Sequence, residues 1–182
     1  MTKQQRALVA VTDFGVEEPE LLTPVGKLRA AGVEVTVASD SGKTIQTVQG
    51  DKDWASTYEP DSALDDVSAD DFDVLVLPGG TVNADNARGN EQLQSLINAF
   101  ASAAKPIAAI CHAPWTLIDA GRAEGKKLTS YPSLRLDLQN AGSTWVDEEL
   151  VRCTANDWVL LTSRNPDDLD AFCSGILDEL GT

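Results

Sequence analysis

The sequence predicts a three-layer α/β domain, with a mainly parallel sheet and helices on both of its faces. Short apolar runs of strand length alternate with segments of helical periodicity along most of the 182 residues. The chain opens with a strand, a helix and a second strand, and such a βαβ unit predicts parallel pairing. The length fits a single domain over residues 1–182 that can bury a substantial core.

The first two thirds of the chain supply three strand-and-helix units, and the turn at 13–15 links the first strand to the first helix. The expected elements are strands at 6–12, 33–38, 73–77 and 106–110, and helices at 18–31, 90–104 and 113–120. Residues 44–58 contain short alternating segments around Gly50, which are typical of either a hairpin or an irregular excursion.

The last third of the chain has shorter elements, joined by turns such as 155–157. We expect a short segment at 128–131, a helix at 133–141, strands at 144–146, 150–154 and 158–162, and a closing helix at 166–180. Because turns join the short strands, some of them should pair antiparallel at the edge of the sheet.

Charge and cysteine content exclude several classes of protein. The net charge of −15 would repel a polyphosphate backbone, so stable nucleic-acid binding is not expected. The three cysteines are widely spaced without a CxxC pair, which argues against a disulfide framework and a structural zinc site. The sequence has no metal-ligand constellation, phosphate-binding glycine loop, signal-peptide pattern or run of about 18 apolar residues. We therefore expect a cytoplasmic protein without a metal, cofactor or membrane partner.

The segment from 105 to 121 carries the strongest functional signal. Cys111 follows an apolar strand and precedes a helical pattern, which places it beside the free N–H groups of a helix start. That position, with an imidazolium next to it, lowers the pKa of a thiol and favours a nucleophilic thiolate. His112 is the only histidine in the chain. The alternative is an inert buried cysteine, and the two side chains converge only if the backbone turns sharply between them.

Two other strand ends should lie beside Cys111, because the carboxyl ends of parallel strands share one edge of a sheet. The residues that follow those strands are Glu17, Glu18 and Glu20 in one loop, and Gly79 and Gly80 in the other. A glutamate pressed against the sulfur would stay protonated and donate to it, and the Gly80 N–H could help to hold an oxyanion. The alternatives are a solvated helix start and an ordinary turn.

Five motifs occur in order along the chain. They are FGVEEPEL at 14–21, LVLPGG at 75–80, KPIAAICHAPWTLIDAG at 105–121, TSYP at 129–132 and NAG at 140–142. Together they resemble the DJ-1/PfpI superfamily, and most closely its PfpI-like branch of protease I and protein deglycase proteins. The resemblance covers nearly the whole chain, and it implies a flavodoxin-like fold with the nucleophile on a strained elbow.

The resemblance also implies roles for individual residues. Cys111 matches the nucleophile, and His112 matches the histidine that follows it. Glu17 matches the glutamate that hydrogen-bonds the thiol. The other matches are the backbone N–H groups of Gly80 and His112 as oxyanion donors, and Gly79, Glu20 and Tyr131 as substrate-binding residues near the pocket.

In PfpI-like oligomers, a glutamate of a neighbouring subunit orients the histidine from the segment after the double glycine. Here that segment reads TVNAD at 81–85, with one extra residue. The resemblance therefore makes Asp85 the candidate for this carboxylate, in a homodimer or a homohexamer.

The implied activity is hydrolysis, in which Cys111 attacks an electrophilic carbonyl and His112 transfers protons. The resemblance favours stress-response detoxification of methylglyoxal, glyoxal and their early adducts on protein side chains. Two alternatives stay open: an intracellular cysteine peptidase of the PfpI type, and a redox sensor or chaperone without turnover. The glutaminase half of an amidotransferase is disfavoured, because that chemistry expects a histidine distant from the cysteine in the sequence.

Overall fold

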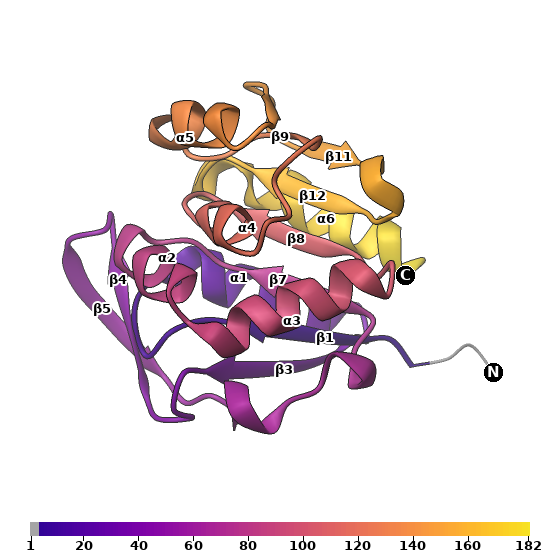
Figure 1. Ribbon diagram of the computed structural model, residues 1–182. Coiled ribbons are helices and arrows are strands. Elements are labelled where there is room, and N and C mark those ends of the chain that lie inside the picture. Colours follow the sequence, from indigo (N-terminus) through magenta and orange to yellow (C-terminus); the bar gives the residue numbers. More distant parts are fainter. Residues whose placement is uncertain (1–3) are drawn as a thin grey trace.

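Seven strands form the central sheet in the computed structural model, which describes residues 4–182 (Figure 1). In spatial order they are β11 (Val151–Cys153), β12 (Leu160–Ser163), β8 (Ile107–Ile110), β7 (Val74–Leu77), β1 (Arg6–Ala10), β3 (Glu34–Ser39) and β6 (Ser62–Ala63). Neighbouring strands pair parallel except β11, which runs antiparallel to β12 at one edge. The expected fold class and the antiparallel edge are confirmed.

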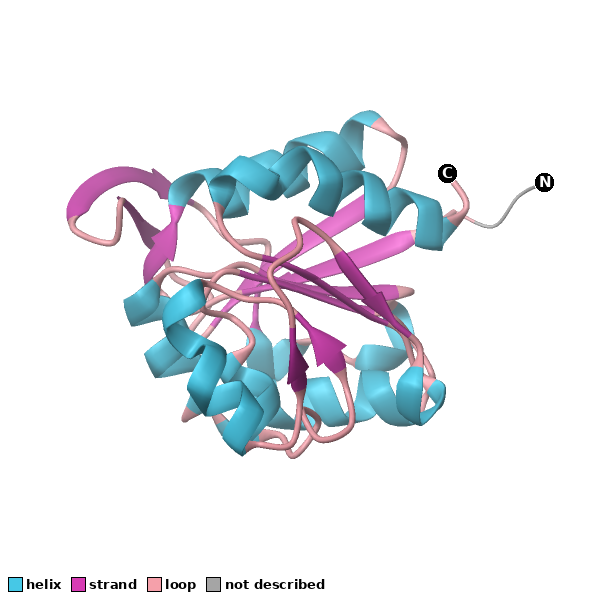
Figure 2. Ribbon diagram, turned by 90° about the horizontal axis from the view of Figure 1, so that it is seen from above, coloured by secondary structure: helices cyan, strands magenta, loops and turns pink. Residues whose placement is uncertain are grey.

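Helices cover both faces of this sheet, so the molecule has three layers (Figure 2). One face is covered by α1 (Glu18–Ala30) and α6 (Leu169–Leu180). The other is covered by α2 (Thr81–Arg88), α3 (Glu91–Ser102), α4 (Trp115–Asp119) and α5 (Arg135–Asn140). Each central strand therefore sends alternate side chains into two apolar cores, which explains why these strands read as continuous apolar runs.

Two smaller sheets accompany the central one. In the first, β4 (Ile45–Gln49) and β5 (Asp53–Tyr58) form an antiparallel hairpin, and β2 (Phe14–Glu17) pairs parallel with β4. The hairpin projects from the carboxyl edge of the central strands (Figure 1). Of the two structures expected for residues 44–58, the hairpin is thus confirmed. In the second, β9 (Lys127–Leu128) and β10 (Thr144–Trp145) pair parallel.

Besides the short edge strand β6, three differences from the elements that the sequence predicts bear on the site. Residues 14–17 form β2 in addition to the expected turn. Residues 81–88 form α2, which was not expected because its buried face consists of Asn83, Ala84 and Ala87 and has no large apolar side chain. The helix α4 begins at Trp115 instead of residue 113, because residues 111–114 form a turn first.

The buried amide of Asn83 explains how so polar a helix docks. Its Nδ2 donates to the carbonyl oxygens of Pro78 and Gly79, and its Oδ1 accepts from the Thr12 N–H. These bonds tie the ends of β1 and β7 together at the edge where the candidate site lies. Among residues 4–182, no helix is both long and apolar enough to span a membrane.

Candidate active site

Cys111 lies on a sharp turn directly after β8. Its φ of 63° is uncommon for a residue other than glycine. Hydrogen bonds hold both of its backbone groups: its N–H donates to the Ser163 carbonyl over 3.1 Å, and its carbonyl accepts from the Tyr131 N–H over 2.8 Å. The turn brings the side chains of Cys111 and His112 together, with Sγ and Nδ1 3.1 Å apart. This is the sharp turn that a functional pair requires.

The carboxyl group beside the thiol belongs to Glu20, and not to Glu17 as the sequence analysis expected. Glu20 is fully buried, its Oε2 accepts from the Gly79 N–H over 2.8 Å, and its carboxyl lies close enough to Cys111 for each group to affect the pKa of the other. Its Oε1 is buried and has no hydrogen-bond partner among the described residues. Glu17 ends β2, and its two oxygens accept from the N–H groups of Gly50 and Asp51 over 2.8 and 3.0 Å instead of contacting the thiol.

Burial controls the protonation of the three groups at the elbow. It raises the pKa of Glu20 to about 8, so this carboxyl is protonated near pH 7. Burial, followed by the Glu20 carboxylate, raises the pKa of the Cys111 thiol, and a hydrogen bond from the Gly80 N–H acts in the opposite direction. Burial also lowers the pKa of His112, against the opposing effect of the Asp51 carboxylate.

Both shifts favour a neutral thiol beside a neutral imidazole in the resting site, whereas the sequence analysis expected a thiolate. Two physical reasons account for the difference. The helix α4 starts four residues after Cys111, so Cys111 does not directly precede the helix start as the sequence analysis expected. Burial disfavours the imidazolium form of His112 that would lower the thiol pKa. A neutral imidazole is nevertheless the form that can accept the thiol proton.

Gly79 and Gly80 lie too close to the elbow for any other residue type. A Cβ on Gly79 would be 2.7 Å from the Cβ of Cys111, and a Cβ on Gly80 would overlap the Gly15 carbonyl oxygen. Gly80 also has a φ of +87°, which favours glycine. Its N–H points at the sulfur, and the His112 backbone N–H donates to no acceptor within residues 4–182. The Gly80 N–H is therefore placed to donate to an oxyanion formed at Cys111, and the same role for the unpaired His112 N–H stays a prediction.

A cavity of about 190 Å³ opens over the thiol at the carboxyl edge of the sheet. Its lining residues are Glu17, Glu20, Gly50, Asp51, Cys111, Tyr131 and Pro166. Three of them carry carboxyl groups and none is basic. The Tyr131 ring stacks on His112 with 4.6 Å between the ring centroids, and it forms one wall. Among residues 4–182, no cluster of three or more histidine, cysteine or acidic side chains could hold a metal ion.

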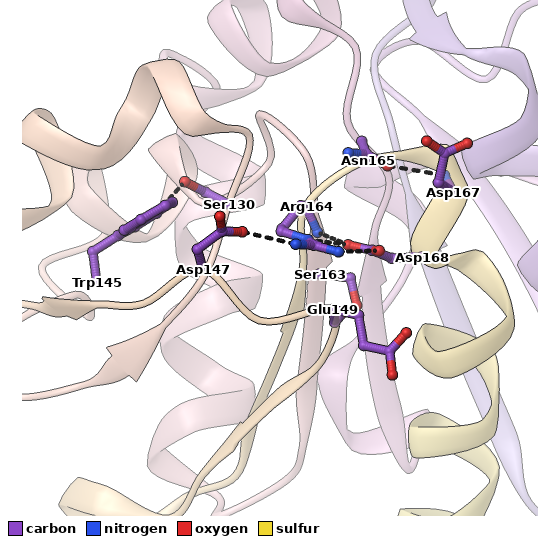
Figure 3. Close-up of polar contacts among 9 residues, drawn as sticks. All are labelled: Ser130, Trp145, Asp147, Glu149, Ser163, Arg164, Asn165, Asp167 and Asp168. Atoms are coloured by element: carbon purple, nitrogen blue, oxygen red, sulfur yellow. Dashed lines mark hydrogen bonds and ion pairs between the residues drawn. The ribbon is translucent and has the colours of Figure 1, made fainter.

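An ionic network behind the elbow holds the segment that carries Ser163 and Pro166 (Figure 3). Arg164 donates from Nε and Nη2 to the two carboxyl oxygens of Asp168, both over 2.8 Å, and from Nη1 to Asp147 over 2.7 Å. The Ser163 hydroxyl donates to the Glu149 carbonyl over 2.6 Å. These contacts join the end of β12 to the start of α6 and to the loop before β11. The carbonyl that accepts the Cys111 N–H is thereby held in place.

The model of the DJ-1/PfpI family matches residues 5–179. This chain belongs to the DJ-1/PfpI family. General stress protein 18 of Bacillus subtilis is 38% identical to it over 168 residues, which cover 92% of this chain and 93% of that protein. Protein/nucleic acid deglycase 2 of Escherichia coli is 36% identical over 178 residues, which cover 97% and 98%.

A solved structure from Anabaena variabilis also resembles this DJ-1/PfpI chain. It is a two-domain protein with DJ-1/ThiJ/PfpI-like and ferritin-like domains, and it superposes with a TM-score of 0.88 at 30% identity. The match covers 98% of this chain and 48% of the other. This chain therefore spans about half the length of that two-domain protein.

The sequence analysis missed two residues of this DJ-1/PfpI site, Asp51 and Thr81. Asp51 lies on the turn between β4 and β5, and its Oδ1 accepts from the Thr81 N–H over 2.6 Å. Thr81 Oγ1 lies 3.3 Å from His112 Nε2. The Gly50-Asp51 pair is a turn signal, but nothing in the sequence indicates that this turn docks beside the end of β7.

Asp85 does not join this group within one chain. It is exposed on α2 and makes no hydrogen bond or ion pair with His112 among the described residues. Its role toward the histidine of a neighbouring subunit stays a prediction.

Proposed function

We propose that this DJ-1/PfpI protein hydrolyses methylglyoxal, glyoxal and their early adducts, with Cys111 as the nucleophile. The observation that carries the proposal is the cavity of about 190 Å³ over the thiol. Pockets for drug-sized ligands have volumes of about 300–1,000 Å³. The smaller cavity suits a carbonyl compound of two or three carbons, or its adduct, better than an extended peptide. The names of the deglycase and stress-protein relatives support the same substrate class and a stress role.

Each group at the elbow has a part in this proposal. Cys111 Sγ adds to the aldehyde carbon while its proton passes to His112 Nδ1, and the N–H groups of Gly80 and His112 stabilise the oxyanion. Proton transfer from the aldehyde carbon to the neighbouring ketone carbon, through an enediol, turns the hemithioacetal into a thioester. His112 and protonated Glu20 are the groups that can carry these protons.

Water then cleaves the thioester and releases the hydroxy acid and the free thiol. The aldehyde carbon is oxidised and the ketone carbon is reduced, so the reaction needs no external oxidant. An adduct on an amine or a thiol enters the same path once that amine or thiol leaves.

The test follows lactate release from methylglyoxal and from methylglyoxal-modified N-acetylcysteine. We expect release by the wild type and by Cys153→Ser, a matched control at a buried cysteine outside the cavity, and none by Cys111→Ser. Equal release by wild type and Cys111→Ser would contradict the proposal. Cleavage of unmodified peptides without lactate release would favour a peptidase instead.

The redox-sensor hypothesis receives less support from the site. Peroxide oxidises the thiolate, whereas burial raises the pKa of Cys111 and leaves its side chain only 3% exposed. A sensor would need the opposite environment.

A further inference from the structure

A continuous line of contacts runs from the sulfur to the turn between β4 and β5 within one chain. Cys111 Sγ lies 3.1 Å from His112 Nδ1, and His112 Nε2 lies 3.3 Å from Thr81 Oγ1. The Thr81 N–H in turn donates to Asp51 Oδ1 over 2.6 Å. His112 is only 4% exposed, so water does not compete freely for its ring nitrogens.

The role of His112 as a base requires one tautomer of its ring. Nδ1 faces the thiol and must be free of a proton, so the neutral ring must carry its proton on Nε2. Thr81 Oγ1 is the acceptor placed to take that hydrogen bond. After Nδ1 has accepted the thiol proton, both ring N–H groups still have partners, the thiolate on one side and Thr81 on the other. A ring with its proton on Nδ1 could not act as the base.

Asp51 holds Thr81 in the position that this contact needs. Thr81 is the first residue of the eight-residue helix α2, and the Asp51 carboxylate accepts its N–H at the positive end of the helix dipole. The carboxylate also places negative charge near the ring, which favours an imidazolium when it forms. Glu17 fixes the turn by accepting from the N–H groups of Gly50 and Asp51, where Asp51 has a φ of 60°.

We propose that Thr81 and Asp51 are positioning residues that set the tautomer and the orientation of His112 within one chain. The inference rests on the proposed function for its catalytic meaning. It differs from the arrangement that the family resemblance implies, in which a carboxylate of a neighbouring subunit orients the histidine. Asp85, the candidate for that carboxylate, lies one turn beyond Thr81 on α2 and is exposed.

Nuclear magnetic resonance tests the tautomer directly, because His112 supplies all imidazole signals of the untagged protein. The ¹⁵N shifts of the ring distinguish a proton on Nε2 from one on Nδ1. We expect the Nε2–H tautomer in the wild type and in Thr81→Ser, which keeps the hydroxyl. Thr81→Val keeps the shape but lacks the acceptor, and we expect it to populate the Nδ1–H form as well. A wild-type tautomer in Thr81→Val would overturn the proposal.

Asp51→Asn provides a second variant that should fold, because asparagine tolerates a positive φ. We expect it to lower the pKa of His112 further, since it removes the charge that favours the imidazolium. Asp85→Asn is the competing variant: orientation within one chain predicts an unchanged tautomer and pKa of His112, whereas orientation by a neighbouring subunit predicts a shift in both. A shift in Asp85→Asn together with none in Asp51→Asn would contradict orientation within one chain.

Lactate release adds a kinetic readout to the spectroscopic one. We expect kcat of Thr81→Val to fall roughly 10- to 100-fold with KM within about twofold, and Thr81→Ser to retain most of the activity. If the wild type releases no lactate, the proposed function fails while the tautomer measurement still decides the positioning role. If the wild type is active and Thr81→Val matches it in both rate and tautomer, the positioning role alone fails.

Discussion

Two residues beside Cys111, Glu20 and His112, have pKa values that burial shifts in opposite directions. Burial raises the pKa of Glu20 to about 8 and lowers the pKa of His112 below its ordinary value of 6.5. At a pH between the pKa of His112 and that of Glu20, the Glu20 carboxyl is protonated and the His112 imidazole is neutral. One group can then donate to the sulfur while the other accepts its proton, so both limbs of a pH profile have a structural origin.

The Glu20→Gln variant should remove the alkaline limb of that profile. In the wild type, we expect kcat/KM for lactate release to fall above about pH 8, because an ionised Glu20 disfavours a thiolate beside it. Glutamine keeps a neutral hydrogen-bonding group and cannot ionise, so kcat/KM of the Glu20→Gln variant should stay level through pH 9. Glu18→Gln, whose side chain contacts Ser56 and not the thiol, should keep the wild-type limb. Identical alkaline limbs in wild type and Glu20→Gln would refute this role.

Elements with a clear apolar pattern were predicted from the sequence, and elements held by polar or long-range contacts were not. The buried strands β1, β7 and β8 were expected because each is a continuous apolar run. The helix α2 was missed because it docks through a buried amide and two alanines, which produce no helical repeat of large apolar residues in the sequence. Glu17 and Glu20 were both singled out, but the place beside the thiol that the resemblance gave to Glu17 belongs to Glu20. The sequence contains their spacing, but not how the junction of β2 and α1 turns each side chain. Asp51 was missed because the docking of its hairpin is a long-range contact.

The junction between β12 and α6 should depend on Arg164. Asp168 is 5% exposed and loses both of its side-chain donors in Arg164→Met, so we expect the free energy of unfolding to fall by about 1.5–3 kcal/mol. The matched control is Arg152→Met, which removes an exposed ion pair to Glu179 and should cost less than about 1 kcal/mol. Urea unfolding followed by circular dichroism measures both. Equal losses in the two variants would show that the Arg164 network (Figure 3) is no more than a surface contact.

Across the whole molecule, buried carboxyl groups make stability depend on pH in two opposite directions. Against the raising effect of burial, hydrogen bonds from Arg164 lower the pKa of Asp168, so its contribution is lost as the pH falls through its folded pKa. Glu20 acts with the opposite sign, because its folded pKa lies above its unfolded value of 4.5. Its contribution is complete below pH 4.5 and is lost as the pH rises toward about 8.

The free energy of unfolding should therefore be greatest near the unfolded pKa of Glu20, 4.5, or just below it, and then decline as the pH rises. Between the unfolded pKa of 4.5 and the folded pKa of about 8, the native state binds the proton of Glu20 and the unfolded state does not, so the decline should reach up to about 1.4 kcal/mol per pH unit. Urea unfolding at intervals from pH 4.5 to 8.5 measures this slope. The formal charge of −15 adds self-repulsion in wild type and Glu20→Gln alike, so a comparison of the two isolates the buried carboxyl. We expect a clearly flatter slope in Glu20→Gln, and parallel slopes would mean that Glu20 is already ionised in the folded protein.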